Sequence, residues 1–329
     1  MIALQPIICR DSYSALVEGP ILGYLLDVVY EPLRELWKTS RLDLTLRLNA
    51  RFGPIETALN KGRLFYRNGV FAGQFTPEVA RELRALGAHF NERTHEFTID
   101  PSRLPADIRL ACTLAETKAD DLFKQTIGLL SQMEENIAKA PTGMSFDSQA
   151  GVIVEDLNQQ FDQSMGPVES ISIPADVTAV VRKQLDERLT KNLDLSVRNF
   201  TADEVLRLRR QAEELAFSGA RADQLARLIE VSYSVSKRKA AFLAAQETSL
   251  AVSNYRQARY EALGSEEYRW STSHDSAVRG DHKDLDGQVF RWDSPPIENK
   301  ATGHRAHPGE GARCRCRAIP LIPDLIAKN

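Results

Sequence analysis

The spacing of apolar residues between positions 105 and 140 is the feature that most constrains the fold. Apolar and small residues follow one another at alternating steps of four and three, the pattern of a long helix that packs along one seam. The seam consists of Ile108, Cys112, Ala115, Ala119, Leu122, Thr126, Leu129, Met133 and Ile137. The pattern predicts one long helix over residues 105–140. A coiled coil and packing on neighbouring helices of the same chain are both open, because small and polar residues interrupt the seam.

Helical spacing recurs in several other parts of the chain. The segment 13–38 is expected to be helical, with interruptions at Pro20 and Pro32. Its apolar face packs on the protein's own core in one interpretation and docks on a partner in the other. Further helices are expected over residues 152–164, 174–195, 202–217, 221–231 and 235–263.

The ends of the C-terminal helices carry sequence signals. Thr201 followed three residues later by Glu204 is a capping box, which predicts the start of the helix 202–217. Gly264 predicts the end of the helix 235–263, because glycine readily adopts the left-handed conformation that closes a helix.

Residues 62–100 have the pattern of a small α/β unit. Asn68-Gly69 stands between aromatic and β-branched residues, which predicts a tight hairpin turn. A helix should follow from Thr76-Pro77 to Gly87. Residues 88–100 alternate like one more strand. We interpret the two histidines of this stretch as strand-face residues, since no cysteine or carboxylate cluster accompanies them.

These elements predict an α+β protein that is predominantly helical, with long helices and two small sheets. The expected parts are an N-terminal helical segment (1–60), a small α/β unit (61–100), a helical region with the long helix (101–199) and a C-terminal module (200–329). The C-terminal module should consist of helices followed by a small sheet.

Composition narrows the class of protein. The chain has 329 residues, with 43% hydrophobic and 26% charged residues, as in ordinary soluble proteins. The formal net charge of -3 argues against a chain whose main work is to wrap nucleic acid. The most apolar early stretch contains Glu18 and Asp27 and a Gly-Pro break, so no membrane span and no targeting segment is expected. The four scattered cysteines suggest a reducing compartment, and synthesis in the cytoplasm is expected.

Imidazole and thiol groups concentrate near the C-terminus. Four of the six histidines and two of the four cysteines lie between positions 274 and 316. A zinc ion takes about four cysteine or histidine ligands. The set His282, His307, Cys314 and Cys316 can supply them, with His304 as a substitute for His307. In the alternative interpretation, the cysteines are small core residues and the histidines cap loops.

The cysteine pair has a predictable geometry. Residues 313–319 alternate like a short strand, so Cys314 and Cys316 should share one face, and Arg313, Arg315 and Arg317 the other. The neighbouring guanidinium groups should lower the pKa of both thiols. A disulfide is not expected, because extended residues two apart lie about 6.5–7 Å apart at Cα. The arginines are expected to pair with acids such as Asp284 or Glu310.

A catalytic interpretation rests on three residues of the same region. Asp275, His282 and Asp286 lie within twelve residues and could, with a metal, hydrolyse phosphodiesters. A cysteine–histidine nucleophile pair is a second such idea. The chain has no P-loop, no Gly-rich dinucleotide loop, no His-Glu-x-x-His and no Gly-x-Ser-x-Gly sequence. We therefore expect a protein that is not an enzyme.

A series of short motifs follows in a fixed order over residues 200–320. They are Glu247-Thr248, Trp270, Asp275, Val278-Arg279, His282, Asp286-Gly287, Pro308-Gly309 and Cys314-Arg315-Cys316. Their order and spacing resemble the phage Mu F-like head morphogenesis family, the minor capsid proteins of tailed phages. Two departures from the family pattern stand out. The run 244–248 lacks the arginine that members often carry, and Arg313 stands where many have asparagine.

The resemblance implies a structural role in the virion, inside the capsid. The implied partners are the phage portal protein, the major capsid or scaffolding protein and genomic DNA, with an influence on DNA packaging or ejection. A metal-dependent nuclease or hydrolase built on the C-terminal His/Asp/Cys cluster is the alternative. Related domains also occur fused to toxins. That arrangement is not expected here, because thirteen residues follow Cys316.

Overall fold

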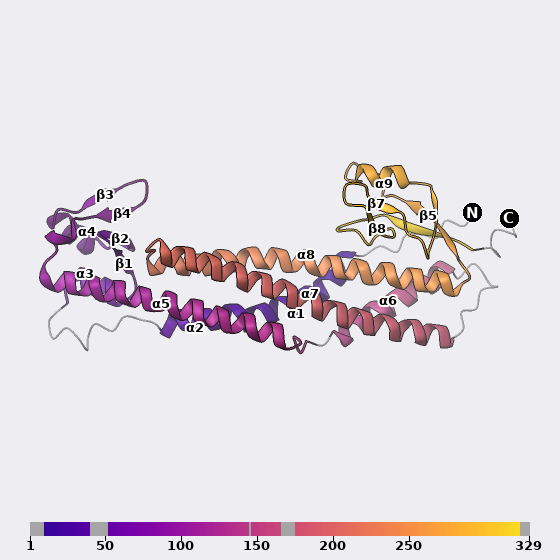
Figure 1. The fold of residues 1–329 in the computed structure, drawn as a ribbon, viewed down its shortest axis with the longest axis horizontal. Helices are drawn as coiled ribbons and strands as arrows, with labels where there is room; N and C mark the ends of the chain where they lie inside the picture. The colour runs from indigo at the N-terminus through magenta and orange to yellow at the C-terminus, as the bar shows by residue number, and fades with distance from the viewer. Residues whose placement is uncertain (1–9, 40–51, 145, 166–174, 323–329) are drawn as a thin grey trace. The chain divides into compact units, whose positions relative to one another are not determined.

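A computed structural model describes residues 10–39, 52–144, 146–165 and 175–322 (Figure 1). The fold is α+β and predominantly helical, as predicted. Two compact units are each built from segments that are distant in the sequence. Unit 1 comprises Met1–Gly23, Pro141–Val197 and Arg238–Asn329, and unit 2 comprises Tyr24–Ala140 and Arg198–Lys237.

Helices supply most of the described residues. The π-helical turn η1 (Leu26–Tyr30) and the 3-10 turn η2 (Pro101–Arg103) accompany the α-helices. The α-helices are α1 (Arg10–Leu25), α2 (Glu31–Thr39), α3 (Pro54–Asn60), α4 (Pro77–Ala85), α5 (Ala106–Lys139), α6 (Asp147–Met165), α7 (Ala175–Phe217), α8 (Ala222–Ala262) and α9 (Gly280–Leu285).

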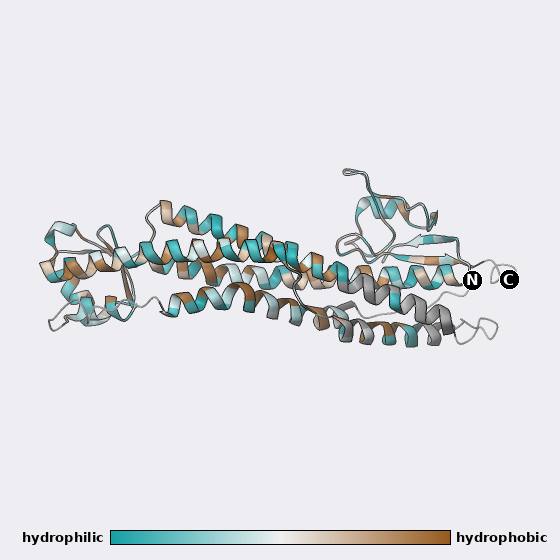
Figure 2. Cartoon of the chain, turned by 60° about the horizontal axis from the view of Figure 1, so that its bottom comes forward, coloured by the Kyte–Doolittle hydropathy of each residue, from teal (hydrophilic) through white to brown (hydrophobic). Residues whose placement is uncertain are grey.

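Helix α5 confirms the long helix predicted over residues 105–140. Most of its predicted seam is buried, but Ala115 and Leu129 are only partly buried. Phe123 and Leu130 are buried beside the seam instead. This shift is the expected drift of a 3.6-residue helix against a strict heptad repeat. Apolar and polar residues share the surface of each long helix, as Figure 2 shows.

The segment 13–38 is helical, but the interruption expected at Pro20 is wrong. Helix α1 continues through Pro20, because Val17, Ile21 and Leu25 are fully buried along one face and tertiary packing outweighs the lost hydrogen bond. The break lies before Pro32, where the backbone N–H of Glu31 reaches back five residues to form the π-helical turn. Leu25 and its neighbours along the helix belong to the protein's own core.

The small α/β unit of unit 2 is a four-stranded antiparallel sheet. Its strand order is β1-β2-β4-β3, and the strands are β1 (Leu64–Arg67), β2 (Val70–Gly73), β3 (His89–Asn91) and β4 (Glu96–Thr98). The turn between β1 and β2 has positive φ angles at Asn68 (46°) and Gly69 (82°), which confirms the predicted hairpin. The single strand expected over residues 88–100 is wrong, since this stretch forms the hairpin β3–β4.

The sheet of unit 2 packs against α3, α4 and the first turns of α5 (Figure 1). Phe71, Phe97 and Leu83 are buried at its centre. Thr76 caps α4 through a hydrogen bond from the backbone N–H of Val79 (3.4 Å), so the predicted helix start is confirmed. The predicted stop is also confirmed, because Gly87 follows with a φ of 84°.

The helices of residues 175–262 are longer than the sequence predicted. Residues 175–217 form one helix, α7, so the capping box expected at Thr201 and Glu204 is wrong. Both side chains are buried inside the helix packing, and Glu204 accepts hydrogen bonds from Arg207 (2.6 Å) and Ser236 (2.5 Å). The two helices expected over 221–231 and 235–263 are likewise one helix, α8. It ends before Gly264, whose φ of 80° confirms the predicted stop.

A second β region follows α8 in unit 1. Strands β6 (Val289–Arg291), β5 (Glu267–Ser271) and β9 (Arg317–Leu321) form an antiparallel sheet in that order. Strands β7 (Ile297–Asn299) and β8 (His304–Arg305) form a separate pair. Trp270 and Trp292 are buried in the core of this region. The sequence predicted this arrangement of helices followed by a small sheet.

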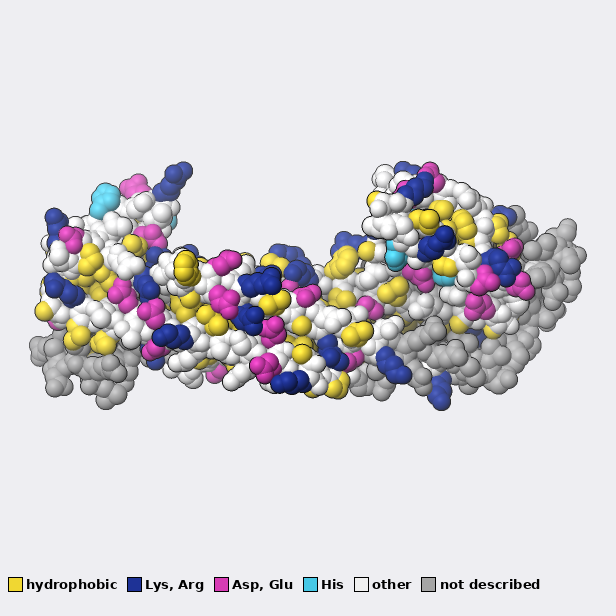
Figure 3. Space-filling view, viewed as in Figure 1, with side chains coloured by type: hydrophobic (Ala, Val, Ile, Leu, Met, Phe, Trp, Pro, Cys, Tyr) yellow, Lys and Arg dark blue, Asp and Glu magenta, His cyan; other side chains and the backbone are white. Residues whose placement is uncertain are grey.

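Charged side chains of both signs are interspersed over the helices on the face drawn in Figure 3. No large patch of basic residues stands out on that face, in keeping with the nearly neutral net charge. Within the part of the chain that the structure describes, no helix combines the length and apolarity needed to cross a membrane.

Candidate metal centre

Three short segments around the C-terminal sheet bring a histidine and two cysteines together. Helix α9 carries His282, and Cys314 and Cys316 lie in the turn that precedes β9. The exposed fractions of these side chains are 2%, 4% and 3%. Burial alternates along residues 313–316 as predicted, although β9 itself begins only at Arg317. The two thiols therefore share one side of the chain.

The imidazole of His282 faces both sulfur atoms. Its Nδ1 lies 3.4 Å from the Sγ of Cys316 and 3.5 Å from the Sγ of Cys314. The three ligand atoms lie within 4.8 Å of one another. Among the described residues, this is the one group of three histidine, cysteine or carboxylate side chains close enough to share a metal ion.

A buried carboxylate holds the other side of the same imidazole. The Oε2 of Glu298, on β7, lies 2.7 Å from the Nε2 of His282. Its Oε1 lies 3.1 Å from the Nδ1 of His304, on β8. A carboxylate accepts a hydrogen bond from the Nε2–H group, which leaves the lone pair of Nδ1 directed at the two sulfur atoms. Sequence spacing gave no signal for Glu298, because the fold of the strand β7, and not a local motif, brings its side chain to His282.

The two thiols have opposite pKa shifts. Donation from the Cys316 thiol lowers the pKa of Cys314, and backbone N–H groups of Cys316 and Gly309 add to this. The same interaction raises the pKa of Cys316, as does its burial. The pair therefore holds one negative charge more readily than two. The expectation that arginines lower the pKa of both thiols is wrong, since hydrogen bonds within the turn are the cause.

His307 lies in a different pocket of the module. Its Nδ1 lies 3.0 Å from the hydroxyl of Tyr268, and its ring contacts the ring of Trp292. Burial lowers the pKa of His307, which favours the neutral ring. The structure thus brings together His282, Cys314 and Cys316 of the predicted ligand set and places His307 elsewhere. His304 reaches the site only through Glu298.

The catalytic interpretation grouped Asp275, His282 and Asp286, but their side chains have different partners. Asp275 pairs with Arg315 at 2.7 Å near the surface. Asp286 accepts a hydrogen bond from the backbone N–H of Thr272 (2.7 Å), while His282 faces the thiols. Asp275 and Asp286 therefore do not join His282 in one site. Arg315 thus pairs with an acid, as expected, but that acid is Asp275 rather than Asp284 or Glu310.

Helix α8 anchors the long loop that ends in the cysteine turn. The side chain of Gln246 donates to the carbonyl of Glu310 (2.9 Å) and accepts from the backbone N–H of Arg313 (3.1 Å). Ser253 donates to the carbonyl of Pro308 (2.9 Å). These contacts hold the backbone on either side of the turn, so the positions of the thiols depend on the helix.

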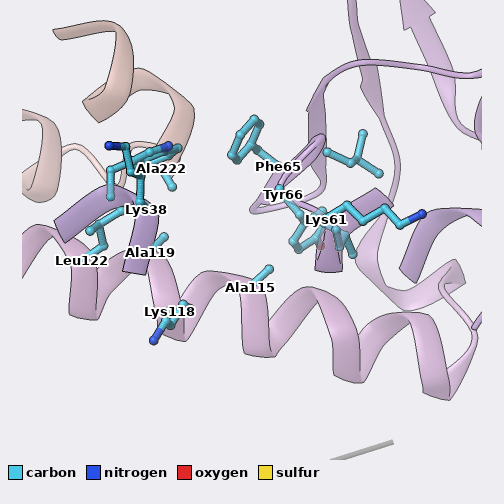
Figure 4. Close-up of a pocket in the computed structure, with 13 residues that line it drawn as sticks. Lys38, Lys61, Phe65, Tyr66, Ala115, Lys118, Ala119, Leu122 and Ala222 are labelled. Atoms are coloured by element: carbon cyan, nitrogen blue, oxygen red, sulfur yellow. The ribbon is translucent and has the colours of Figure 1, made fainter. Parts of the chain in front are cut away.

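Unit 2 contains a cavity of about 320 Å³ between α2, α3, β1, α5 and the first residue of α8 (Figure 4). Trp37, Phe65 and Tyr66 form an aromatic part of its wall, and Lys61 and Lys118 also line it. Such a lining suits a ligand with an apolar body and a negative charge. No sequence pattern indicated this cavity, because its walls come from separated segments.

The C-terminal region matches a known family. Residues 208–319 match the family model described as Phage Mu protein F like protein. They form a phage Mu F-like module. The match begins within α7 and ends within β9, so it contains His282, Cys314, Cys316 and Glu298. This confirms the family that the order of motifs implied.

A protein of Haemophilus influenzae strain Rd, named only as an uncharacterized protein, is similar to part of this chain. The two sequences are 36% identical over 95 residues, which are 28% of this chain and 20% of the relative. The chain thus matches about a fifth of the relative's length. No solved structure is significantly similar to the chain.

Proposed function

We propose that this protein is a tailed-phage minor capsid protein that acts in head morphogenesis. The observation that carries the proposal is the phage Mu F-like module over residues 208–319. In the proposed role, the protein associates with the portal protein and the capsid interior during head assembly, and it affects DNA packaging or ejection. The virion is its final location, after synthesis in the host cytoplasm.

Features of the chain itself favour assembly over catalysis. The long helices α5, α7 and α8 offer extended surfaces of mixed charge, which suit protein partners. The net charge of -3 makes DNA a secondary partner in this proposal. The major capsid or scaffolding protein is a further proposed partner.

The alternative of a metal-dependent hydrolase finds little support at the site. A catalytic metal must present an open position to its substrate. His282 and the two thiols are at most 4% exposed, so a phosphodiester cannot approach them without a rearrangement. We expect no metal-dependent cleavage of DNA or RNA, and cleavage that disappears in a His282→Ala variant would revive the alternative.

Co-expression with the cognate portal protein tests the proposed function. Affinity purification of the full chain should recover assembled portal rings, at salt concentrations that leave those rings intact. A portal protein from a phage without a Mu F-like protein is the matched control and should not be recovered. Recovery of neither portal, or of both equally, would contradict a specific association with the portal.

A further inference from the structure

We propose that His282, Cys314 and Cys316 bind one zinc ion through the imidazole Nδ1 and the two sulfurs. This inference rests on the geometry of the three side chains and is independent of the proposed function. Zinc is the class of ion favoured by a mixed set of thiolate and imidazole ligands in a closed site.

The distances fit a shared ion. Zinc bonds of about 2.0–2.1 Å to nitrogen and about 2.3 Å to sulfur place two such ligand atoms about 3.5 Å apart in a tetrahedron. The observed separations from the His282 Nδ1 are 3.4 Å to Cys316 and 3.5 Å to Cys314. The ion therefore fits with little movement of the imidazole relative to either sulfur.

The surroundings of His282 are those of a metal ligand. Histidines that bind metals usually donate their second ring N–H to a carboxylate, which fixes the ring orientation and makes the free nitrogen more basic. Glu298 occupies that position at 2.7 Å, and it is itself only 6% exposed. His304 holds the second oxygen of Glu298 at 3.1 Å. The carboxylate is thus fixed from both sides.

The cysteine turn is shaped to hold thiolates. The backbone N–H of Cys316 lies 3.4 Å from the sulfur of Cys314, and such N–H contacts stabilise negative charge on sulfur. Trp270 belongs to the same core cluster as both cysteines, and its indole N–H is buried without a hydrogen-bond partner among the described residues. A buried donor of this kind is costly unless it finds an acceptor.

The fourth coordination position would be taken by a single water molecule, which is small enough for a buried site that excludes a phosphodiester. Structural zinc sites have four ligands, and the described residues bring three ligand atoms together. His307, the fourth residue of the sequence-based set, hydrogen-bonds Tyr268 instead. The proposal therefore predicts that His307 is dispensable for zinc, whereas His282 is not.

Metal analysis of the full chain, purified without chelators, tests the proposal. Elemental analysis should find one zinc ion per chain, and cobalt substitution should give the absorption of thiolate-bound cobalt. Cys314→Ser, Cys316→Ser and His282→Gln should each lose most of the metal. Cys112→Ser, which alters a buried cysteine of unit 2, and His307→Gln are matched controls that should keep one ion per chain.

Two further measurements keep the test decisive if the ligand variants fail to fold. In the unmodified protein, alkylation of Cys314 and Cys316 should rise when a chelator is added, while alkylation of the buried Cys112 should not change. Glu298→Gln, which keeps the ligands, should weaken zinc affinity roughly 10–100-fold.

Unmodified protein that contains no zinc, takes up no cobalt through thiolates and shows no effect of chelator on alkylation would overturn the proposal. Zinc that persists in the His282 and cysteine variants would also overturn it.

Discussion

At the scale of single residues, the C-terminal module depends on the line of contacts from the thiols through His282 and Glu298 to His304. Each member comes from a different loop or short element, so these few contacts tie together segments that bury little apolar surface of their own. Residue type alone pointed to His282 and the cysteines. It could not exclude His307 or find Glu298, because long-range folding decides which side of the module each loop residue faces.

Gly311 tests how tightly Glu298 is held. A Cβ atom added at this glycine would lie 2.9 Å from the Oε2 of Glu298, the oxygen that contacts His282. We expect Gly311→Ala to cost about 1–3 kcal/mol of unfolding free energy, because the carboxylate cannot move without losing its partner. Gly280→Ala is the control, since a Cβ there meets nothing within 4 Å. Equal stability of the two variants in urea unfolding would mean that Glu298 moves freely.

Glu247 should make the stability of unit 1 depend on pH. Burial raises the pKa of this carboxyl, despite a hydrogen bond from Ser196 (2.8 Å). A raised pKa in the folded state favours folding below the pKa of the unfolded chain, and that advantage is lost as pH rises through the folded pKa. Glu247→Gln should therefore be more stable than the unmodified protein at pH 7, with the difference shrinking toward pH 4. Urea unfolding at both pH values measures this, and a constant difference would contradict it.

At the scale of elements, the sequence predicted helices well and their boundaries poorly. The hairpin at Asn68-Gly69 and the helix start at Thr76 were predictable, because local backbone preferences decide them. Thr201 and Glu204 form the same local pattern as a helix start, yet α7 continues through them. Glu204 pairs with Arg207 one turn along α7 and accepts a hydrogen bond from Ser236 of α8. The contact with Ser236 is a tertiary one, which a local pattern cannot reveal.

A proline at position 199 distinguishes one helix from two. Asn199 is exposed within α7, two residues before the false start at Thr201. Asn199→Pro should cost about 3 kcal/mol or more in a continuous helix, whereas a break at this point would tolerate it. Asn199→Ala is the control and should be neutral or slightly stabilising, since alanine favours helix. The unfolding midpoints of the two variants are compared. Near-equal midpoints would mean that α7 is broken near residue 199.

At the scale of the whole molecule, the chain combines a phage Mu F-like module with residues 1–207, which lie outside the family match. Its four-part division into 1–60, 61–100, 101–199 and 200–329 stays a prediction. The two compact units are each assembled from separated segments, because α7 and α8 contribute to both. This arrangement depends on which long helices pack against one another, and local sequence patterns do not specify that pairing.

The most direct measurement of the central claim is the protein composition of purified phage heads. Quantitative mass spectrometry should be applied to DNA-free heads and to virions of the phage or prophage that encodes this chain. A head morphogenesis protein should be present in one or both particles, at a small fraction of the major capsid protein. If the protein is abundant in the lysate but absent from both kinds of particle, its assignment as a head morphogenesis protein is contradicted.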